Sequence, residues 1–165
     1  MLSGHSRLFC PPELSLLAFD SVNDWIANES STFSKDSVIR NLVIATGLEY
    51  DTCKMIVEDP GKLSIQQVYG LIQDYAGKRI LVDKTPGYTR SLDTLERAEM
   101  MFENTRYIYL HRHPYPVIDS FVRNRLDKFL KVEDVDPYWY AEKFWATSNH
   151  NVMKLFESVA AERTF

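Results

Sequence analysis

Tyr107 to Arg125 reads YIYLHRHPYPVIDSFVRNR, and this stretch decides the expected fold. It opens with the alternating, β-favouring residues Tyr107 to Leu110 and breaks at Arg112-His113-Pro114. Beyond the break, apolar residues recur at helical spacing: Val117, Ile118, Phe121 and Leu126. The pattern predicts a strand, a short turn and a helix. In an open parallel α/β sheet, ligands bind where strands end in such turns.

Arg112 falls at the turn, and Ser120 lies about two helical turns further on, about 9 Å along the helix axis. A guanidinium fork and a hydroxyl at this separation can converge on one phosphate. The free N–H groups of a helix start also favour anions. The alternative is that the Ser120 hydroxyl bonds the carbonyl four residues earlier. The pair is a candidate phosphate site.

A second strand is expected at Arg79 to Val82, followed by Asp83-Lys84 and by a helix from about Ser91 to Phe102. Two strands joined by one helix form a parallel, right-handed β-α-β unit. Their ends then point the same way, which would place Lys84 and Arg112 on one rim. The alternative for Lys84 is an exposed lysine at a strand end.

Helix start and stop signals organise the rest of the chain. The expected helices are a loosely helical face from Leu14 to Ile26, one from Ser34 to Gly47, one over Tyr50–Glu58, one from the Ser64/Gln67 capping box to Gly77, and one beginning at Asp136-Pro137. The middle third carries no obvious chemistry, which favours a packing or substrate-covering subdomain.

Composition indicates one globular domain over residues 1–165, since 45% of the residues are apolar and 13% aromatic. A net charge of −4 argues against nucleic acid held by a broad basic surface. Cys10 and Cys53 lack metal-ligand spacing and are expected to be reduced thiols in a cytoplasmic protein. With no apolar run of about 18 residues and no leader pattern, a soluble, unexported chain without a membrane partner is expected.

Three segments resemble the PAPS-dependent sulfotransferases of the bacterial type, including those built into polyketide synthases. They are DKTPGY at 83–88, RHPYPVIDSFVRNR at 112–125 and GHSRLFCPPELSLL at 4–17. The resemblance implies an α/β fold with a parallel sheet flanked by helices, the P-loop-NTPase-like sulfotransferase fold. It also implies PAPS, 3′-phosphoadenosine 5′-phosphosulfate, as co-substrate and no metal. Spacing likewise offers no third ligand for a metal ion.

The same resemblance implies roles for four residues. Arg112 and Ser120 would hold the 3′-phosphate of the donor, Lys84 would lie close to the transferred sulfuryl group, and Glu13 would be the general base. Taken from the sequence alone, Glu13 is equally a carboxylate complementing the dipole of the helix that follows it. His111 and His113 are rival bases, because histidine titrates near neutrality; each is also readily explained as a turn or packing residue.

The sequence departs from the family pattern at its ends. The 5′-phosphosulfate loop is expected just before Met1, and a further strand and a basic loop after Phe165, so the domain is expected to be partial, incomplete at both ends. The expected function is sulfuryl transfer from PAPS to a hydroxyl of a small-molecule or carrier-protein-bound acceptor. The alternative is a catalytically inactive remnant. A phosphoryl-transfer enzyme is disfavoured because no G-x-x-x-x-G-K occurs. The acceptor and the oligomeric state stay open.

Overall fold

The computed structural model describes residues 2–32, 34–59, 61, 63–130, 132 and 134–165, and the side chains at 30–32 and 129 lie outside that description. The chain divides into two compact units, Met1–Gly87 and Tyr88–Phe165. Each unit has its own set of packed elements. A single domain over residues 1–165 therefore stays a prediction.

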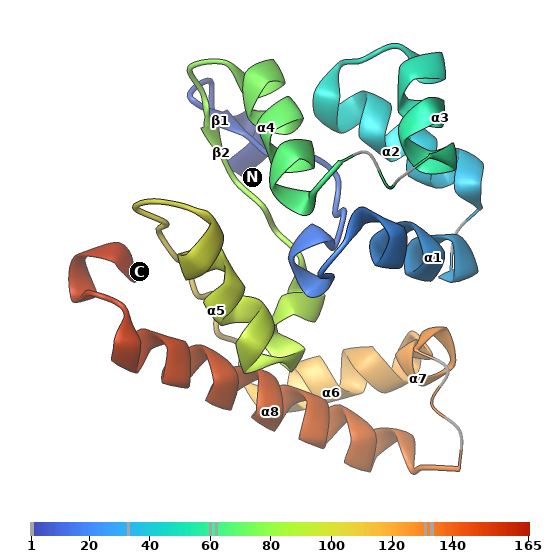
Figure 1. Ribbon diagram of the computed structural model, residues 1–165. Coiled ribbons are helices and arrows are strands. Elements are labelled where there is room, and N and C mark those ends of the chain that lie inside the picture. The colour runs from blue at the N-terminus through green and yellow to red at the C-terminus, as the bar shows by residue number, and fades with distance from the viewer. Residues whose placement is uncertain (1, 33, 60, 62, 131, 133) are drawn as a thin grey trace. The chain divides into compact units, whose positions relative to one another are not determined.

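The first unit combines helices with a small parallel sheet (Figure 1). Its elements are β1 (Leu8–Phe9), α1 (Val22–Thr32), α2 (Lys35–Thr46), α3 (Tyr50–Glu58), α4 (Ile65–Ala76) and β2 (Ile80–Leu81). The strands pair in parallel, with Leu8 opposite Ile80 and Phe9 opposite Leu81. Parallel strands need a long crossover, and the four helices between β1 and β2 provide it. The predicted α/β class with parallel strands and flanking helices is confirmed.

The apolar faces of these helices build the core of the first unit. The indole of Trp25 is 1% exposed, and its Nε1 donates a hydrogen bond to the backbone oxygen of Leu14 at 2.5 Å. The other largest fully buried side chains of this unit are Leu16, Val22, Leu42, Cys53, Ile65, Val68 and Ile72. Cys10 and Cys53 are both free thiols. The expected helical face from Leu14 to Ile26 is split into a 3-10 turn at Leu16–Ala18 and the start of α1.

The predicted caps form as expected. Ser34 Oγ accepts the N–H of Ser37 at the start of α2, and Gly47 ends that helix with φ of 65°. Ser64 and Gln67 form a reciprocal capping box, with the Ser64 N–H donating to Gln67 Oε1 at 2.7 Å and the Gln67 N–H donating to Ser64 Oγ at 3.1 Å. These bonds satisfy backbone groups that helix termini leave unpaired.

The second unit is almost entirely helical. It contains α5 (Leu92–Met101), α6 (Pro114–Arg123), α7 (Leu126–Phe129) and α8 (Pro137–Ser158), with 3-10 turns at Pro86–Arg90, where the unit begins, and at Ala161–Arg163. The long helix α8 packs against both α5 and α6 (Figure 1). Asp136 caps α8 by accepting the Trp139 N–H at 2.8 Å, and Pro137 occupies its first position, as predicted.

Two local predictions need correction. The stretch Tyr107 to Leu110 forms no regular strand; Tyr107 makes a single parallel bridge to Thr164, extended by a bond from the Tyr109 N–H to Phe165 O at 2.8 Å. The helix does not reach Leu126, because α6 ends at Arg123 and Arg125 has φ of 53°, in the left-handed region. A helix cannot continue through that conformation, so Leu126 begins α7 instead.

The two strands of the predicted β-α-β unit have other partners among the described residues. β2 is hydrogen-bonded to β1, whereas Tyr107 is hydrogen-bonded to the segment that follows α8. They also belong to different compact units. The shared rim for Lys84 and Arg112 therefore stays a prediction.

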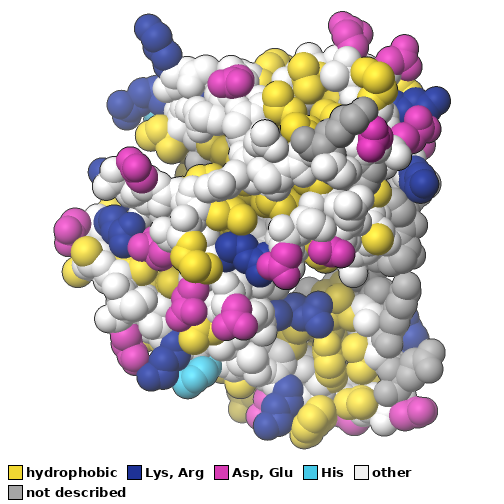
Figure 2. Space-filling view, in the orientation of Figure 1, with side chains coloured by type: hydrophobic (Ala, Val, Ile, Leu, Met, Phe, Trp, Pro, Cys, Tyr) yellow, Lys and Arg dark blue, Asp and Glu magenta, His cyan; other side chains and the backbone are white. Residues whose placement is uncertain are grey.

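Acidic and basic side chains are interspersed over the surface of both units (Figure 2). Neither unit gathers its cations into one broad patch on the face shown. This agrees with the small net charge of −4. Among the described helices, none has the length and apolar character required to cross a lipid bilayer.

Candidate functional site

Glu13 and Lys84 meet at the ends of the two paired strands. Glu13 follows β1 after Pro11-Pro12, which fix the backbone, and Lys84 lies three residues beyond β2. Because the carboxyl ends of parallel strands lie at the same edge, both side chains reach that edge. The structure pairs Lys84 Nζ with Glu13 Oε1. The Lys84 side chain is 66% exposed and the Glu13 side chain 47% exposed, so both remain accessible to a ligand.

Asp83 anchors the backbone next to Lys84. Its Oδ2 accepts a hydrogen bond from the Tyr69 hydroxyl at 2.5 Å, and its Oδ1 accepts one from Thr85 Oγ1 at 3.2 Å. Tyr69 comes from α4 and is only 5% exposed. A buried tyrosine thus ties the end of β2 to the helix that precedes it. The sequence signal for Tyr69 was its place on the apolar face of α4, which indicates packing but does not reveal this bond.

Arg112 precedes α6 in the second unit and is held through its backbone. The indole Nε1 of Trp145 on α8 donates to Arg112 O at 3.2 Å. The guanidinium makes no hydrogen bond or ion pair with any residue in the described part of the chain. A positioned backbone with an exposed, unneutralised cation is what an anion site requires.

The two histidines flanking Arg112 have structural contacts. His113 Nδ1 accepts the N–H of Tyr115 at 3.4 Å, so its side chain caps α6. The His111 ring lies 5.9 Å from the Tyr109 ring and 5.8 Å from the Trp145 ring. Both contacts agree with the turn and packing interpretations of these residues. The choice of base among Glu13, His111 and His113 stays a prediction.

The first turn of α6 offers fewer backbone donors than a helix start normally provides. Pro114 and Pro116 carry no N–H, and the N–H of Tyr115 is already bonded to His113. The first three residues of α6 therefore offer no free N–H group to an anion, contrary to the expectation from the sequence. An anion at this turn would depend on side chains, chiefly Arg112, together with the dipole of the helix.

Ser120 lies in the seventh position of α6, half-buried. Its Oγ accepts a hydrogen bond from Asn124 Nδ2 at 3.2 Å, and the same amide donates to Ser120 O at 2.7 Å. The sequence signal for Asn124 is its position four residues after Ser120, a spacing that allows this contact on a helix. Ser120 Oγ donates no hydrogen bond to any described residue, so its proton is available for a ligand oxygen.

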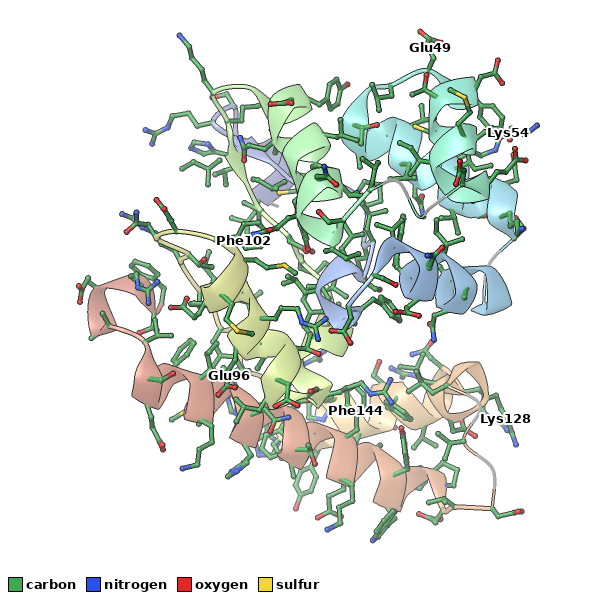
Figure 3. All side chains as sticks on the ribbon, in the orientation of Figure 1. Glu49, Lys54, Glu96, Phe102, Lys128 and Phe144 are labelled. Atoms are coloured by element: carbon green, nitrogen blue, oxygen red, sulfur yellow. The ribbon has the colours of Figure 1, made fainter. Side chains whose placement is uncertain are left out.

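Two of the basic residues at and beyond the end of α6 have acidic partners. Arg123 lies 3.7 Å from Asp119, and Arg125 lies 3.6 Å from the buried carboxylate of Asp127. Lys128 on α7 is exposed (Figure 3). Ion pairs of this kind are typical of a solvated surface.

Two of the four predicted site residues lie in each unit. Glu13 and Lys84 are in contact within Met1–Gly87, whereas within Tyr88–Phe165 Arg112 precedes α6 and Ser120 lies inside it. A shared phosphate for Arg112 and Ser120 stays a prediction. No group of three or more histidine, cysteine, aspartate or glutamate side chains in the described residues is placed to hold a metal ion.

Comparison with known proteins identifies the fold and the family. A sequence model of the sulfotransferase family matches residues 1–165. A sulfotransferase domain from the curacin biosynthetic pathway is 38% identical, with a TM-score of 0.83, and the match covers 99% of this chain and 59% of that one. A sulfotransferase domain from the Synechococcus PCC 7002 olefin synthase is 34% identical, with a TM-score of 0.84, covering 99% and 57%.

The chain thus spans less than two thirds of the length of these two domains. A search of curated protein sequences found no significant match. Both domains share the fold over nearly the whole chain, and more than a third of the aligned residues are identical in each case. These matches confirm the sulfotransferase fold expected from the sequence. This chain belongs to the sulfotransferase family.

Proposed function

We propose that this chain transfers a sulfuryl group from PAPS to a hydroxyl of a small-molecule or carrier-protein-bound acceptor. Membership of the family supports sulfuryl transfer in general. The observation that carries the specific proposal is the contact between Glu13 and Lys84 at the ends of β1 and β2. A carboxylate thereby lies beside a cation at the edge of a parallel sheet, and ligands of such folds bind at such edges.

Sulfuryl transfer resembles phosphoryl transfer in requiring positioning and charge neutralisation more than covalent catalysis by the protein. Glu13 would accept the proton of the acceptor hydroxyl as that oxygen bonds to sulfur and the bond from sulfur to the bridging phosphate oxygen breaks. Lys84 would neutralise charge on the transferred group and on the leaving phosphate. The products are a sulfate ester and adenosine 3′,5′-bisphosphate, and the proton resides on Glu13.

Arg112 and Ser120 would bind the 3′-phosphate of the donor. The exposed Arg112 guanidinium would supply positive charge. The Ser120 hydroxyl, which accepts a hydrogen bond from Asn124 Nδ2, would donate its own proton to a phosphate oxygen. The Trp145 bond to Arg112 O would hold the arginine backbone during binding. These features fit a phosphate ligand without help from the N–H groups of α6.

A transfer assay with PAPS and a hydroxyacyl thioester as the probe acceptor tests the proposal. Glu13→Gln should remove transfer while leaving the affinity for adenosine 3′,5′-bisphosphate unchanged, because the amide cannot accept the proton. Lys84→Gln should lower transfer by about 10- to 100-fold through loss of charge stabilisation. Glu49→Gln and Lys78→Gln are matched controls, since both residues are exposed in the same unit.

Equal transfer by the parent chain and Glu13→Gln would assign the base to another group. Binding of adenosine 3′,5′-bisphosphate without transfer to the thioester or to a free alcohol would favour the inactive remnant. That outcome would leave the fold and the phosphate-binding pair intact but overturn the proposed reaction.

A further inference from the structure

A small hollow in the second unit has a lining that includes none of the residues of the proposed donor site. It has a volume of about 170 Å³ and is lined by Arg90, Tyr140, Lys143, Phe144, Thr147 and Ser148. All but Arg90 come from α8. Phe144 lies on α8 (Figure 3), and its ring is 5.7 Å from the Phe121 ring of α6.

Two cations border the hollow without a carboxylate partner. Arg90 Cζ lies 6.0 Å from the centre of the Phe144 ring, and Lys143 Nζ lies 5.7 Å from the centre of the Trp139 ring. Neither side chain makes a hydrogen bond or ion pair with any residue that the structure describes. This distinguishes them from Arg123 and Arg125, which both have acidic partners. Two positive charges therefore remain uncompensated at the rim.

The hydroxyl of Ser148, a residue that lines the same hollow, has an unused hydrogen-bonding capacity. Ser148 Oγ is buried and has no hydrogen-bond partner among the described residues. Serines within helices usually bond the carbonyl one turn earlier when no other partner is present. A buried hydroxyl without a partner costs free energy, and a ligand oxygen between the two cations would remove that cost.

We propose that this hollow binds the phosphate group of a small organic phosphate ester. The two cations match the two charges of a phosphate monoester better than the single charge of a carboxylate. Ser148 would donate to one phosphate oxygen, and the organic part would lie against Phe144 and Tyr140. The hollow is smaller than the roughly 300–1,000 Å³ of sites that enclose a whole ligand, so it accommodates one head group and the adjoining atoms.

Titration of the full chain with phenyl phosphate tests this site, with α8 amide shifts and binding heat as readouts. Arg90→Gln and Lys143→Gln should each weaken binding about three- to tenfold, because each removes one exposed charge contact. Lys154→Gln on the same helix is the matched control, since Lys154 pairs with Glu157 at 2.9 Å. Its affinity for phenyl phosphate should equal that of the parent chain.

Other ligands and variants test which groups the hollow recognises. Benzoate should bind more weakly than phenyl phosphate, and benzyl alcohol should not bind at millimolar concentration. Arg112→Ala should leave phenyl phosphate affinity unchanged, which distinguishes this hollow from the proposed donor site. Ser148→Ala should weaken binding without lowering the melting temperature, because it removes a hydroxyl that has no partner in the free protein.

Equal affinity of the parent chain, Arg90→Gln and Lys143→Gln would overturn the proposal. Equal binding of benzyl alcohol and phenyl phosphate would also overturn it, because the hollow would then recognise only an aromatic ring. Loss of phenyl phosphate binding in Arg112→Ala would reassign the signal to the donor site.

Discussion

Lys84 Nζ contacts Glu13 Oε1 although the two residues are 71 positions apart in the chain. The contact follows from the parallel pairing of β1 with β2, which brings the segments after both strands to one edge. Both residues are exposed. The pair is therefore better suited to contacting a ligand than to holding the fold together.

A double-mutant cycle on this pair should show little effect on stability. We expect Glu13→Gln, Lys84→Met and the double variant to unfold within a few degrees of the parent chain, with a coupling free energy below about 1 kcal/mol. Urea unfolding monitored by far-ultraviolet circular dichroism measures this quantity. A coupling of several kcal/mol would indicate a structural ion pair and weaken the catalytic assignment.

Gly47 should not tolerate a side chain. It ends α2 with φ of 65°, and an added Cβ would come within 2.3 Å of the Tyr75 ring. Gly47→Ala should cost about 1–3 kcal/mol of unfolding free energy, because a strained backbone and an aromatic clash act together. Gly70→Ala is the control: Gly70 lies inside α4 with nothing near an added Cβ, so this change should stabilise by about 0.5–1 kcal/mol. Equal effects at both positions would contradict the geometry at Gly47.

The sequence predicted elements best where the signal is local. Ser34, Ser64 and Asp136 marked helix starts because a short polar side chain can bond nearby N–H groups, and Gly47 marked an end because it adopts positive φ. The left-handed conformation of Arg125 was missed, since arginine carries no preference that signals it.

Contacts between distant segments were partly predictable. The pairing of Glu13 with Lys84 required knowledge that β1 pairs with β2, whereas the place of Lys84 at a strand end was visible in the sequence. The hydrogen bonds from Tyr69 to Asp83 and from Trp145 to Arg112 could not be predicted from the sequence. Aromatic residues at helical spacing indicate core packing and do not reveal a polar partner. The small number of N–H donors at the start of α6 follows from Pro114 and Pro116, which contradicts the prediction that free N–H groups favour an anion there.

Glu29 should make the chain less stable as pH rises. Burial raises the pKa of this carboxyl, opposed by a hydrogen bond from Ser15. A carboxyl whose folded pKa exceeds its unfolded pKa contributes stability below the unfolded value, and this stability is lost as pH rises through the folded value. Glu29→Gln should therefore raise the melting temperature by about 1–3 °C at about pH 7.5 and have no effect at about pH 4. Glu49→Gln, at an exposed site, is the control; a lower melting temperature for Glu29→Gln at neutral pH would contradict the burial argument.

Glu99 should make the chain less stable as pH falls. Its carboxylate receives hydrogen bonds from Arg163 at 2.6 and 3.2 Å and from the Tyr107 hydroxyl at 2.7 Å, and the Arg163 bonds chiefly lower the pKa of Glu99. Stability from this group is present above the unfolded pKa and is lost as pH falls through the lowered folded pKa. Glu99→Gln should lower the melting temperature by about 2–4 °C at neutral pH, with the difference shrinking below about pH 4.

Glu96→Gln serves as the control for this prediction, because Glu96 lies on the same helix and is exposed (Figure 3). It should melt like the parent chain throughout the same pH range. A difference between Glu99→Gln and the parent chain that persists unchanged at acid pH would assign the effect to packing instead of ionisation.

Binding of the donor product tests the account most directly. Isothermal titration should compare adenosine 3′,5′-bisphosphate with adenosine 5′-monophosphate, which lacks the 3′-phosphate, for the parent chain, Arg112→Ala and the exposed control Arg106→Ala. We predict that the parent chain and Arg106→Ala bind the bisphosphate more tightly, by about tenfold or more, and that Arg112→Ala binds both nucleotides equally. A preference for the bisphosphate that survives in Arg112→Ala, or no binding by the parent chain at millimolar ligand, would contradict the proposal that Arg112 holds the 3′-phosphate.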